Sequence, residues 1–353
     1  MKEIGNISEL LKPLGFKLDL NQPYVSGERF LMAGSKFVLA GTKIDGTKVI
    51  IKTSSKPEGK KEIESEKKAR DLMRTLVFAN NKILIPEEIY FGKNGEYVFL
   101  ITRFIPQEKV FVAHSVEEQF FIALSAFEAQ ESFHATTFEH IRTIKDVFPV
   151  LHSKEYLGEF SRLKESTLKN YSDKNLRETL EKTETFLKKN LVTIDRHANY
   201  LTHTDFVPHN FRLSGRSLYM LDCVPNYATV HFGNKYEGWA RFLNFMMIHS
   251  PELDKLLTKY IRDNRGEDEY LSLRLMRAYK LTFLLDFYAR SLEKTIGDLH
   301  NLTLARIAYW RGALNAVLED QPLSKEVTDQ YIKTRNSLRS EEEKVRQKEF
   351  NVV

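Results

Sequence analysis

The order of extended and helical segments constrains the fold of this chain more than any other feature of its sequence. Before Ile105-Pro106, five extended segments rich in β-branched and aromatic residues surround one helical segment. The extended segments lie at 29–33, 36–44, 47–53, 83–92 and 96–104. Apolar positions at helical spacing predict the helix at 60–77, between the third and fourth strands.

Turn residues connect neighbouring strands in this first part. Asp45-Gly46 lies between the second and third strands, and a two-residue Asp-Gly loop is a strong hairpin signal. A turn at Lys93-Asn94-Gly95 joins the last two strands. A short amphipathic helix at 6–15, with Ser8 as N-cap and Gly15 as its stop, precedes them. The first part is therefore predicted to be a small antiparallel sheet with one main helix.

The second part is predicted to be mostly α-helical. Helical patterns cover 115–140, 153–190 and the chain from Tyr236 onward, and the charged stretch 323–350 reads as an exposed or frayed helix. Only 211–221 reads as a hairpin, around Ser214-Gly215-Arg216. The fold class is thus α+β, and its two parts are residues 1–104, an N-terminal lobe, and residues 105–353, a C-terminal helical lobe.

Composition indicates a reducing compartment and argues against a membrane protein. The chain of 353 residues has one cysteine, Cys223, which excludes an internal disulfide and a cysteine-rich zinc site. Its first twenty residues carry charges throughout and lack the apolar core of a signal peptide. No uncharged apolar stretch approaches the ~20 residues that cross a bilayer. We therefore expect a cytoplasmic protein that binds no membrane.

The net positive charge of the chain comes entirely from its first part. Residues 1–104 hold 18 Lys and Arg against 13 Asp and Glu, which equals the net charge of +5, and the remainder balances at 35 against 35. A modest excess of this kind suits an anionic ligand such as a nucleotide, or is simply a solvated lysine-rich surface. No basic stripe interleaved with aromatic residues stands out, so nucleic acid is not an expected partner.

The segment LTHTDFVPHNFRL (201–213), followed by LYMLDCV (218–224), carries the chemistry. Asp205 and Asn210 lie five residues apart across a proline-containing loop, and Asp222 follows the second strand of the hairpin. A hairpin brings its two ends together, so Asn210 and Asp222 should converge. Two such oxygen ligands suit a magnesium ion that bridges phosphates, and Asp205 would accept a hydroxyl proton. His203 would brace the loop backbone.

The motif His-x-Asp-x4-Asn, present from His203 to Asn210, resembles the catalytic loop of the aminoglycoside phosphotransferase and choline kinase-like family. Leu221-Asp222 after a short hairpin resembles the metal-binding aspartate of that family. An Asp-x4-Asn pair after a histidine is not rare by chance, and the following hairpin makes the motif specific. The resemblance spans about residues 20 to 320. It implies a two-lobed protein kinase-like fold, ATP and Mg²⁺ as cofactors, and phosphoryl transfer to a small hydroxylated molecule.

Lys52 is an independent sign of a nucleotide site. It closes the apolar run KVIIKTS, where a lysine is costly unless its ammonium meets an anion. In the resembled family this lysine contacts the α- and β-phosphates and pairs with a helix glutamate. Glu62, Glu64 and Glu66 compete for that role, and Glu66 is favoured because it shares a helix face with apolar positions, with Glu62 second.

Two other segments are expected to contact the nucleotide. Gly34-Ser35-Lys36 lies between extended segments, where its backbone N–H groups would cover the phosphates, or where it forms an ordinary turn. The segment around Arg103, Phe104 and Ile105 resembles the hinge whose main-chain groups bind adenine. His134, in FEAQESFHATT, is expected to have a core or capping role instead of a catalytic one.

One position departs from the family pattern. In FGNKYEGWARFL (232–243), the aspartate that the family has two residues before the alanine is Gly238, and Glu237 precedes it. That aspartate braces the catalytic loop. Either Glu237 replaces it from one residue away, or the brace comes from elsewhere.

The acceptor and the competing functions stay open at this point. An aminoglycoside would require acidic groups such as Glu117-Glu118 or Glu267-Asp268-Glu269. Choline would require an aromatic cage, for which Trp239, Tyr309 and Trp310 are candidates. Aromatic residues at helical spacing, however, usually belong to the core. A sugar or another amino alcohol is an alternative acceptor. The alternatives to a small-molecule kinase are a protein kinase and a nucleotide-binding scaffold without turnover. The protein is expected to be a monomer or a homodimer.

Overall fold

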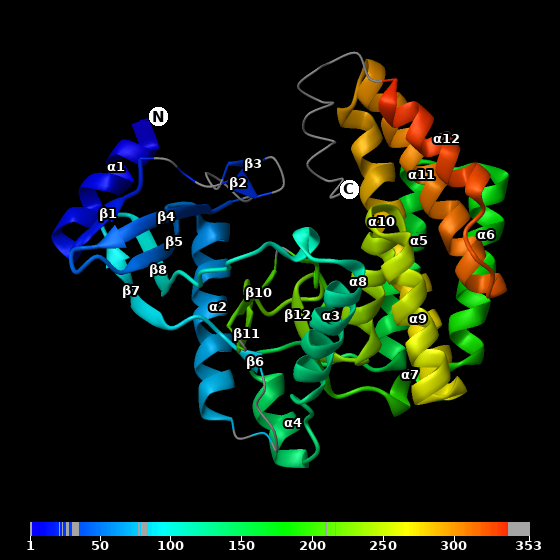
Figure 1. Cartoon of the computed structure of the whole chain (residues 1–353), viewed down its shortest axis with the longest axis horizontal. Helices are drawn as coiled ribbons and strands as arrows, with labels where there is room; N and C mark the ends of the chain where they lie inside the picture. Colours follow the sequence, from blue (N-terminus) through cyan, green and yellow to red (C-terminus); the bar gives the residue numbers. More distant parts are fainter. Residues whose placement is uncertain are drawn as a thin grey trace.

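The main sheet of the N-terminal part has five antiparallel strands in the order β1-β4-β5-β8-β7 within the residues that the structure describes (Figure 1). This computed structural model describes residues 2–20, 22, 24–25, 28–29, 35–76, 78, 83–208, 210–215 and 217–337. The strands are β1 Phe16–Leu18, β4 Phe37–Lys43, β5 Lys48–Ser54, β7 Glu88–Asn94 and β8 Tyr97–Arg103.

The predicted hairpins form where local turn chemistry favours them. The Thr47 N–H donates to Asp45 Oδ1 at 2.9 Å, and Gly46 takes a positive φ of 88° between β4 and β5. Gly95, at φ 58°, turns β7 into β8. Inward residues of β4, β5 and β8 form an apolar core with the first helix. The sheet is thereby fixed in register by its turns.

Two helices pack with this sheet. Helix α1, Lys2–Leu11, starts four residues before the predicted helix, so Ser8 lies inside it and is not its N-cap. A 3₁₀ turn, Lys12–Leu14, follows, and Gly15 ends it at φ 80°, as predicted. Helix α2, Pro57–Thr75, begins earlier than predicted because Pro57 stands in its first turn, where no N–H is needed.

Two predicted strands differ from the structure. The segment 83–92 contains two strands in different sheets, β6 Ile83–Leu84 beside β11, and β7 in the main sheet. Pro86 lies between them, lacks an N–H for a ladder, and accepts a hydrogen bond from Arg70 on its carbonyl. Of the predicted strand 29–33, only Arg29 is described, in the small ribbon of β2 Tyr24–Val25 and β3 Glu28–Arg29.

The C-terminal part is mostly helical, as predicted. Its helices are α3 Val116–Glu131, α4 Phe138–Lys145, α5 Ser153–Asn170, α6 Lys174–Lys189, α7 Leu191–Arg196, α8 Tyr236–His249, α9 Pro251–Arg265, α10 Glu267–Ser291, α11 Gly297–Glu319 and α12 Lys325–Asn336, with 3₁₀ turns at Phe111–Ala113 and Leu292–Lys294. The single block expected at 115–140 is broken between α3 and α4, where His134 bridges to Tyr200.

Short strands in this part flank the loop 204–210. β9 Tyr200–His203 pairs with β12 Val230–Gly233, a strand that the sequence pattern missed, and β10 Phe211–Ser214 pairs with β11 Ser217–Met220. Helices α8 and α10 are largely buried behind them. The whole is an α+β fold with a small antiparallel sheet and a larger helical part. That residues 1–104 and 105–353 are separate domains stays a prediction.

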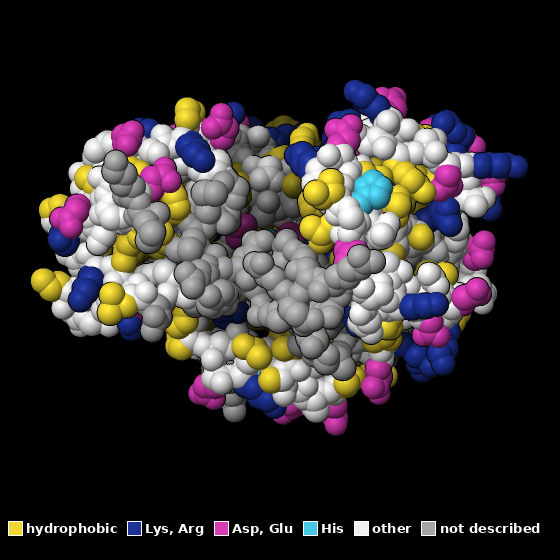
Figure 2. Space-filling model, turned by 90° about the horizontal axis from the view of Figure 1, so that it is seen from above, with side chains coloured by type: hydrophobic (Ala, Val, Ile, Leu, Met, Phe, Trp, Pro, Cys, Tyr) yellow, Lys and Arg dark blue, Asp and Glu magenta, His cyan; other side chains and the backbone are white. Residues whose placement is uncertain are grey.

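The surface and the helices give two negative findings. On the face in Figure 2, the described basic and acidic side chains are interspersed around the rim, and no field of one sign dominates it. Across the described part of the chain, no helix combines the length and the apolar character that a membrane crossing requires.

Candidate functional site

The β10–β11 hairpin brings Asn210 and Asp222 to the same end of one sheet. Phe211 pairs with Met220, and the Leu221 N–H donates to the Asn210 carbonyl at 2.8 Å, which closes the hairpin. Asp222 follows with φ 55°, a left-handed conformation that few residues other than glycine adopt. This conformation re-aims the Asp222 side chain away from the strand direction.

Asp205 and Asn210 are joined directly. The Asn210 Nδ2 donates to the Asp205 carbonyl at 2.7 Å and to Asp205 Oδ2 at 3.1 Å. The Asn210 N–H donates to the Val207 carbonyl at 2.9 Å, so the loop is a tight turn. Because the amide nitrogen of Asn210 is anchored in this way, its side-chain oxygen points to the opposite side. His209 lies outside the described residues.

Arg241 on α8 is the partner of the expected base. Its Nε and Nη2 lie 3.0 and 2.9 Å from Asp205 Oδ1. Removal from water alone would raise the pKa of Asp205, but the Arg241 guanidinium outweighs it and holds the pKa of that carboxyl below its usual range. Asp205 is therefore ionised at neutral pH, with about half of its side chain (46%) exposed to solvent.

His203 is buried and faces the hairpin. Its Nε2 lies 3.0 Å from the Leu221 carbonyl, which fixes Nε2 as the protonated nitrogen of a neutral ring. Burial lowers the pKa of His203 below its usual value. A neutral ring whose N–H is already used suits a structural link between the loop and the hairpin.

Gln130 on α3 contacts the loop where the family pattern has an aspartate on α8. Its Oε1 accepts the His203 backbone N–H at 2.8 Å. A Cβ atom at Gly238 would lie 2.7 Å from Gln130 Nε2 and 3.3 Å from the His203 carbonyl, so Gln130 fills the space that a side chain at 238 would need. Glu237 points elsewhere, to Tyr156 and His231 at 2.7 and 2.8 Å. The brace therefore comes from α3.

Lys52 lies between two carboxylates. Its Nζ is 2.8 and 2.7 Å from the two oxygens of Glu66 on α2 and 2.9 Å from Asp222 Oδ1. Burial acts to lower the pKa of Lys52, but Asp222 and Glu66 together raise it above its ordinary value. Of the three glutamates considered, Glu66 makes this contact, while Glu64 pairs with Lys93 at 3.1 Å.

Lys36, expected to contribute only a backbone N–H, joins this cluster through its side chain. Its Nζ lies 2.5 Å from Glu62 Oε1 and 3.4 Å from Asp222 Oδ1, and only 5% of its side chain is exposed. Burial would raise the pKa of Asp222, but the Lys52 and Lys36 ammonium groups hold it well below its usual range. The sequence pattern did not predict this role of the Lys36 side chain.

The oxygen set at this place fits a magnesium ion. The side-chain oxygen of Asn210 and the ionised carboxylate of Asp222 are hard oxygen donors, and Asp222 already attracts two cations. Among the described residues no group of three or more His, Cys, Asp or Glu side chains could hold a metal. Mg²⁺ is commonly bound by one or two carboxylates together with phosphates and water, and such a site needs no larger cluster.

The expected hinge residues lie at the end of β8. The Arg103 N–H donates to the Glu87 carbonyl at 2.8 Å, and the Phe104 N–H donates to the Lys48 carbonyl at 2.9 Å, so the sheet uses both donors. Among the described residues no backbone hydrogen bond engages the Ile105 N–H. Of the three, Ile105 is thus the residue whose N–H the sheet does not use.

The expected phosphate loop is only partly described. Gly34 lies outside the described residues. The Ser35 carbonyl accepts from Ser54 Oγ at 2.7 Å, beside the start of α2.

His134 stacks on Tyr200 with ring centroids 4.0 Å apart, which is a packing contact.

Most of the groups considered for cationic acceptors, other than Glu117 and Glu267, are buried or have other partners. Trp239, Tyr309 and Trp310 are at most 5% exposed and belong to the apolar core. Glu118 caps α3 in a capping box with Ser115. The acidic start of α10 is engaged by Arg196 and Lys235, among others.

No family model matches this chain, and no curated protein matches its sequence. Solved structures do match its fold. A thermostable mutant of aminoglycoside phosphotransferase APH(4)-Ia, in ternary complex with ADP and hygromycin B, has a TM-score of 0.60 and 14% identity, over 89% of this chain and 98% of that chain. ADP-bound aminoglycoside phosphotransferase APH(2'')-Ib has a TM-score of 0.57 and 14% identity, over 90% and 98%. The GDP complex of wild-type aminoglycoside 2'-phosphotransferase-IIIa has a TM-score of 0.58 and 14% identity, over 89% and 99%. The expectation of this fold is thereby confirmed.

Proposed function

We propose that this chain, which has the fold of the aminoglycoside phosphotransferases, transfers the γ-phosphate of ATP to a hydroxyl group of a small molecule. One observation carries the proposal. Lys52, held by Glu66, meets Asp222 at 2.9 Å, directly beside Asn210 and Asp205. A lysine that burial would discharge but two carboxylates keep charged, together with a carboxylate of lowered pKa, is typical of functional sites. Solved structures of this fold contain ADP or GDP.

Each residue has a distinct part in this reaction. Lys52 would exchange Asp222 for the α- and β-phosphates, with Glu66 keeping the ammonium in place. Asn210 and Asp222 would hold Mg²⁺, which when bound neutralises the charge of the phosphates. Asp205 would accept the hydroxyl proton, and Arg241 would keep the carboxylate oriented and ionised.

The acceptor is expected to be a neutral or anionic hydroxyl compound. Arg241 contacts Asp205 directly, and the Lys280 ammonium, buried beside Glu237 at 3.4 Å, also helps to lower the pKa of Asp205. A cation that contacts the base, with a second one close enough to act on its charge, opposes a polycationic acceptor such as an aminoglycoside. The buried Trp239 leaves choline without one wall of the cage considered above. A sugar or a hydroxy acid fits these charges better.

Both alternatives receive less support. In protein kinases a long segment follows the metal aspartate. Here the chain between Asp222 and Tyr236 is short and consists of a tight turn and β12. The Asn226 N–H closes the turn by donating to the Val230 carbonyl at 3.0 Å. A scaffold without turnover rested on Gly238. Because Gln130 braces the loop, that glycine no longer argues against catalysis.

A coupled assay of ADP release tests the proposal. A sugar, a sugar acid, choline and an aminoglycoside are offered as acceptors to the wild type and to Asp205→Asn. We expect the sugar or the sugar acid to stimulate magnesium-dependent ADP release in the wild type only. Stimulation that persists in Asp205→Asn, or labelled phosphate found on protein serine or threonine, would refute the proposal.

A further inference from the structure

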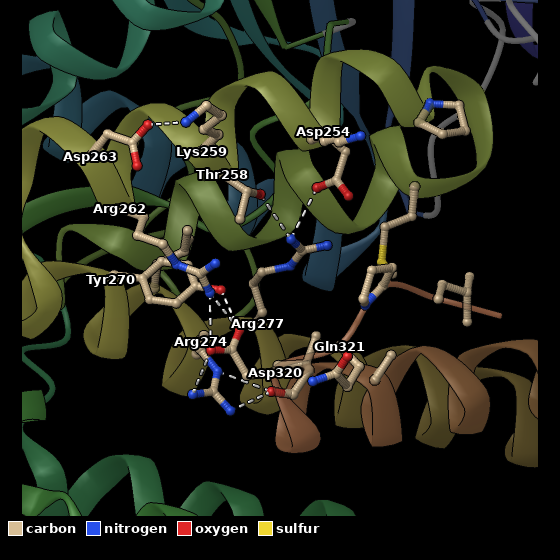
Figure 3. A pocket seen from close by; sticks show the side chains of 18 of the residues that line it. Asp254, Thr258, Lys259, Arg262, Asp263, Tyr270, Arg274, Arg277, Asp320 and Gln321 are labelled. Carbon is tan, nitrogen blue, oxygen red and sulfur yellow. Dashed lines mark hydrogen bonds and ion pairs between the residues drawn. The ribbon is translucent and has the colours of Figure 1, made fainter.

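A cavity of about 560 Å³ lies among α9, α10, the end of α11 and the segment that leads to α12 (Figure 3). Its size is typical of small-molecule sites. None of Lys52, Asp205, Asn210 or Asp222 is among the described residues that line it. The proposed phosphotransfer therefore does not explain this cavity.

The wall of the cavity is cationic. Its charged side chains are Lys255, Lys259, Arg262, Arg274 and Arg277 against Asp254, Asp263 and Asp320. Asp320 takes two of the arginines, with Arg262 Nη2 at 2.8 Å and Arg274 Nη1 at 3.7 Å, and also accepts from the Tyr270 hydroxyl at 2.5 Å. Five cations against three carboxylates leave an excess of two positive charges around the cavity.

Arg277 is the buried donor of this wall, with 7% of its side chain exposed. Its Nε donates to Asn244 Oδ1 at 3.1 Å, and its Nη1 donates to Thr258 Oγ1 at 3.2 Å and lies 3.0 Å from Asp254. Its Nη2 is buried and has no partner among the described residues. Figure 3 shows the guanidinium between α9 and α11. Buried donors without an acceptor are rare in folded proteins, so Nη2 is available to donate to an oxygen atom of a ligand.

The remaining wall is apolar, with Met247, Leu273, Val317 and Leu323 on it. We propose that the cavity binds a small organic anion, whose carboxylate or phosphate accepts from Nη2 of Arg277 and whose apolar body covers these side chains. The charge selects the acidic group, and the apolar wall excludes a bare inorganic ion as the preferred occupant.

Calorimetric titration with phenyl phosphate, benzoate and benzylamine tests this site. The variants are Lys255→Glu at the cavity and the matched control Lys169→Glu on α5; both lysines are exposed, so the two change the net charge equally. We expect one of the two anions to bind the wild type and benzylamine not to bind. Lys255→Glu should weaken binding about two- to fivefold, as for an exposed ion pair, and Lys169→Glu should leave it unchanged.

Arg277→Met should abolish binding, and circular dichroism shows whether this variant is folded. If it is not folded, the comparison of Lys255→Glu with Lys169→Glu still tests the site. Lys52→Met, combined with Glu66→Leu so that no carboxylate stays buried without its partner, removes a cation of the nucleotide site and should leave anion binding unchanged. Equal binding of benzylamine, equal titrations of Lys255→Glu and Lys169→Glu, loss of binding in Lys52→Met/Glu66→Leu, or no anion binding at millimolar concentration would each overturn the inference.

Discussion

Gly238→Ala should destabilise the protein, although alanine is the better helix former. A Cβ at this position would lie 2.7 Å from Gln130 Nε2, and Gln130 is 1% exposed with its Oε1 bound to the His203 N–H. Displacing the amide leaves that buried N–H without an acceptor, which costs about 1–3 kcal/mol, and overpacking adds a similar amount. The gain in helix propensity is only about 1 kcal/mol. The expected net loss is therefore about 1–5 kcal/mol.

Gly158 on α5 supplies the matched control. A Cβ there meets nothing within 4 Å, so Gly158→Ala should stabilise by about 0.5–1 kcal/mol. Urea unfolding of both variants measures the two free energies. If Gly238→Ala stabilises as Gly158→Ala does, Gln130 does not hold the loop as argued.

A double variant tests the exchange of one brace for the other. In Gln130→Ala/Gly238→Asp, the aspartate occupies the space that Gln130 leaves and can accept the His203 N–H. Its loss of unfolding free energy should be smaller, by at least about 1 kcal/mol, than the sum of the losses in the two single variants. Additive effects would show that the two positions act independently.

Three further changes probe the charged groups. Folding lowers the pKa of buried Glu237 from 4.5 to about 2. The ionised carboxylate therefore stabilises the fold by about 3 kcal/mol above pH 4.5, and this stabilisation is lost as the pH falls toward 2. In urea unfolding at several pH values, Glu237→Gln should remove this part of the dependence of the unfolding free energy on pH. Lys52→Met should destabilise by about 3–5 kcal/mol because Glu66 stays buried without its main partner, and adding Glu66→Leu should recover most of this loss in the same measurement. Arg241→Gln removes the cation that depresses the pKa of Asp205, so the acidic limb of the pH profile of kcat/KM should move to higher pH; an unmoved limb would exclude Asp205 as the base.

Local chemistry made most of the fold predictable from the sequence. The Asp45-Gly46 loop and the 211–221 hairpin follow from turn residues and alternating strands, and the structure has both. Errors arose where the local pattern does not decide. The strand pattern at 83–92 continues across Pro86, but the chain there leaves one sheet for another, which depends on a distant partner strand.

The residues of the candidate site likewise fall into those that the sequence pattern predicts and those that it does not. Asp205, Asn210 and Asp222 could be grouped from the sequence because one short hairpin joins them. Arg241, Gln130 and Lys36 could not, because they approach the loop from three separate elements. Lys36 lies 186 residues from its partner Asp222, and no local pattern encodes such a contact. The Gly238 departure indicated that a brace was missing but not where its replacement lies.

The most direct test of the central claim is a calorimetric titration with a nonhydrolysable ATP analogue, with and without Mg²⁺, on the wild type and Asp222→Asn. Because the Asp222 carboxylate both holds the ion and attracts Lys52, the wild type should bind the analogue tightly only with Mg²⁺. Asp222→Asn should lose this dependence on Mg²⁺. Equal binding by both proteins, or wild-type binding that does not depend on Mg²⁺, would contradict the account.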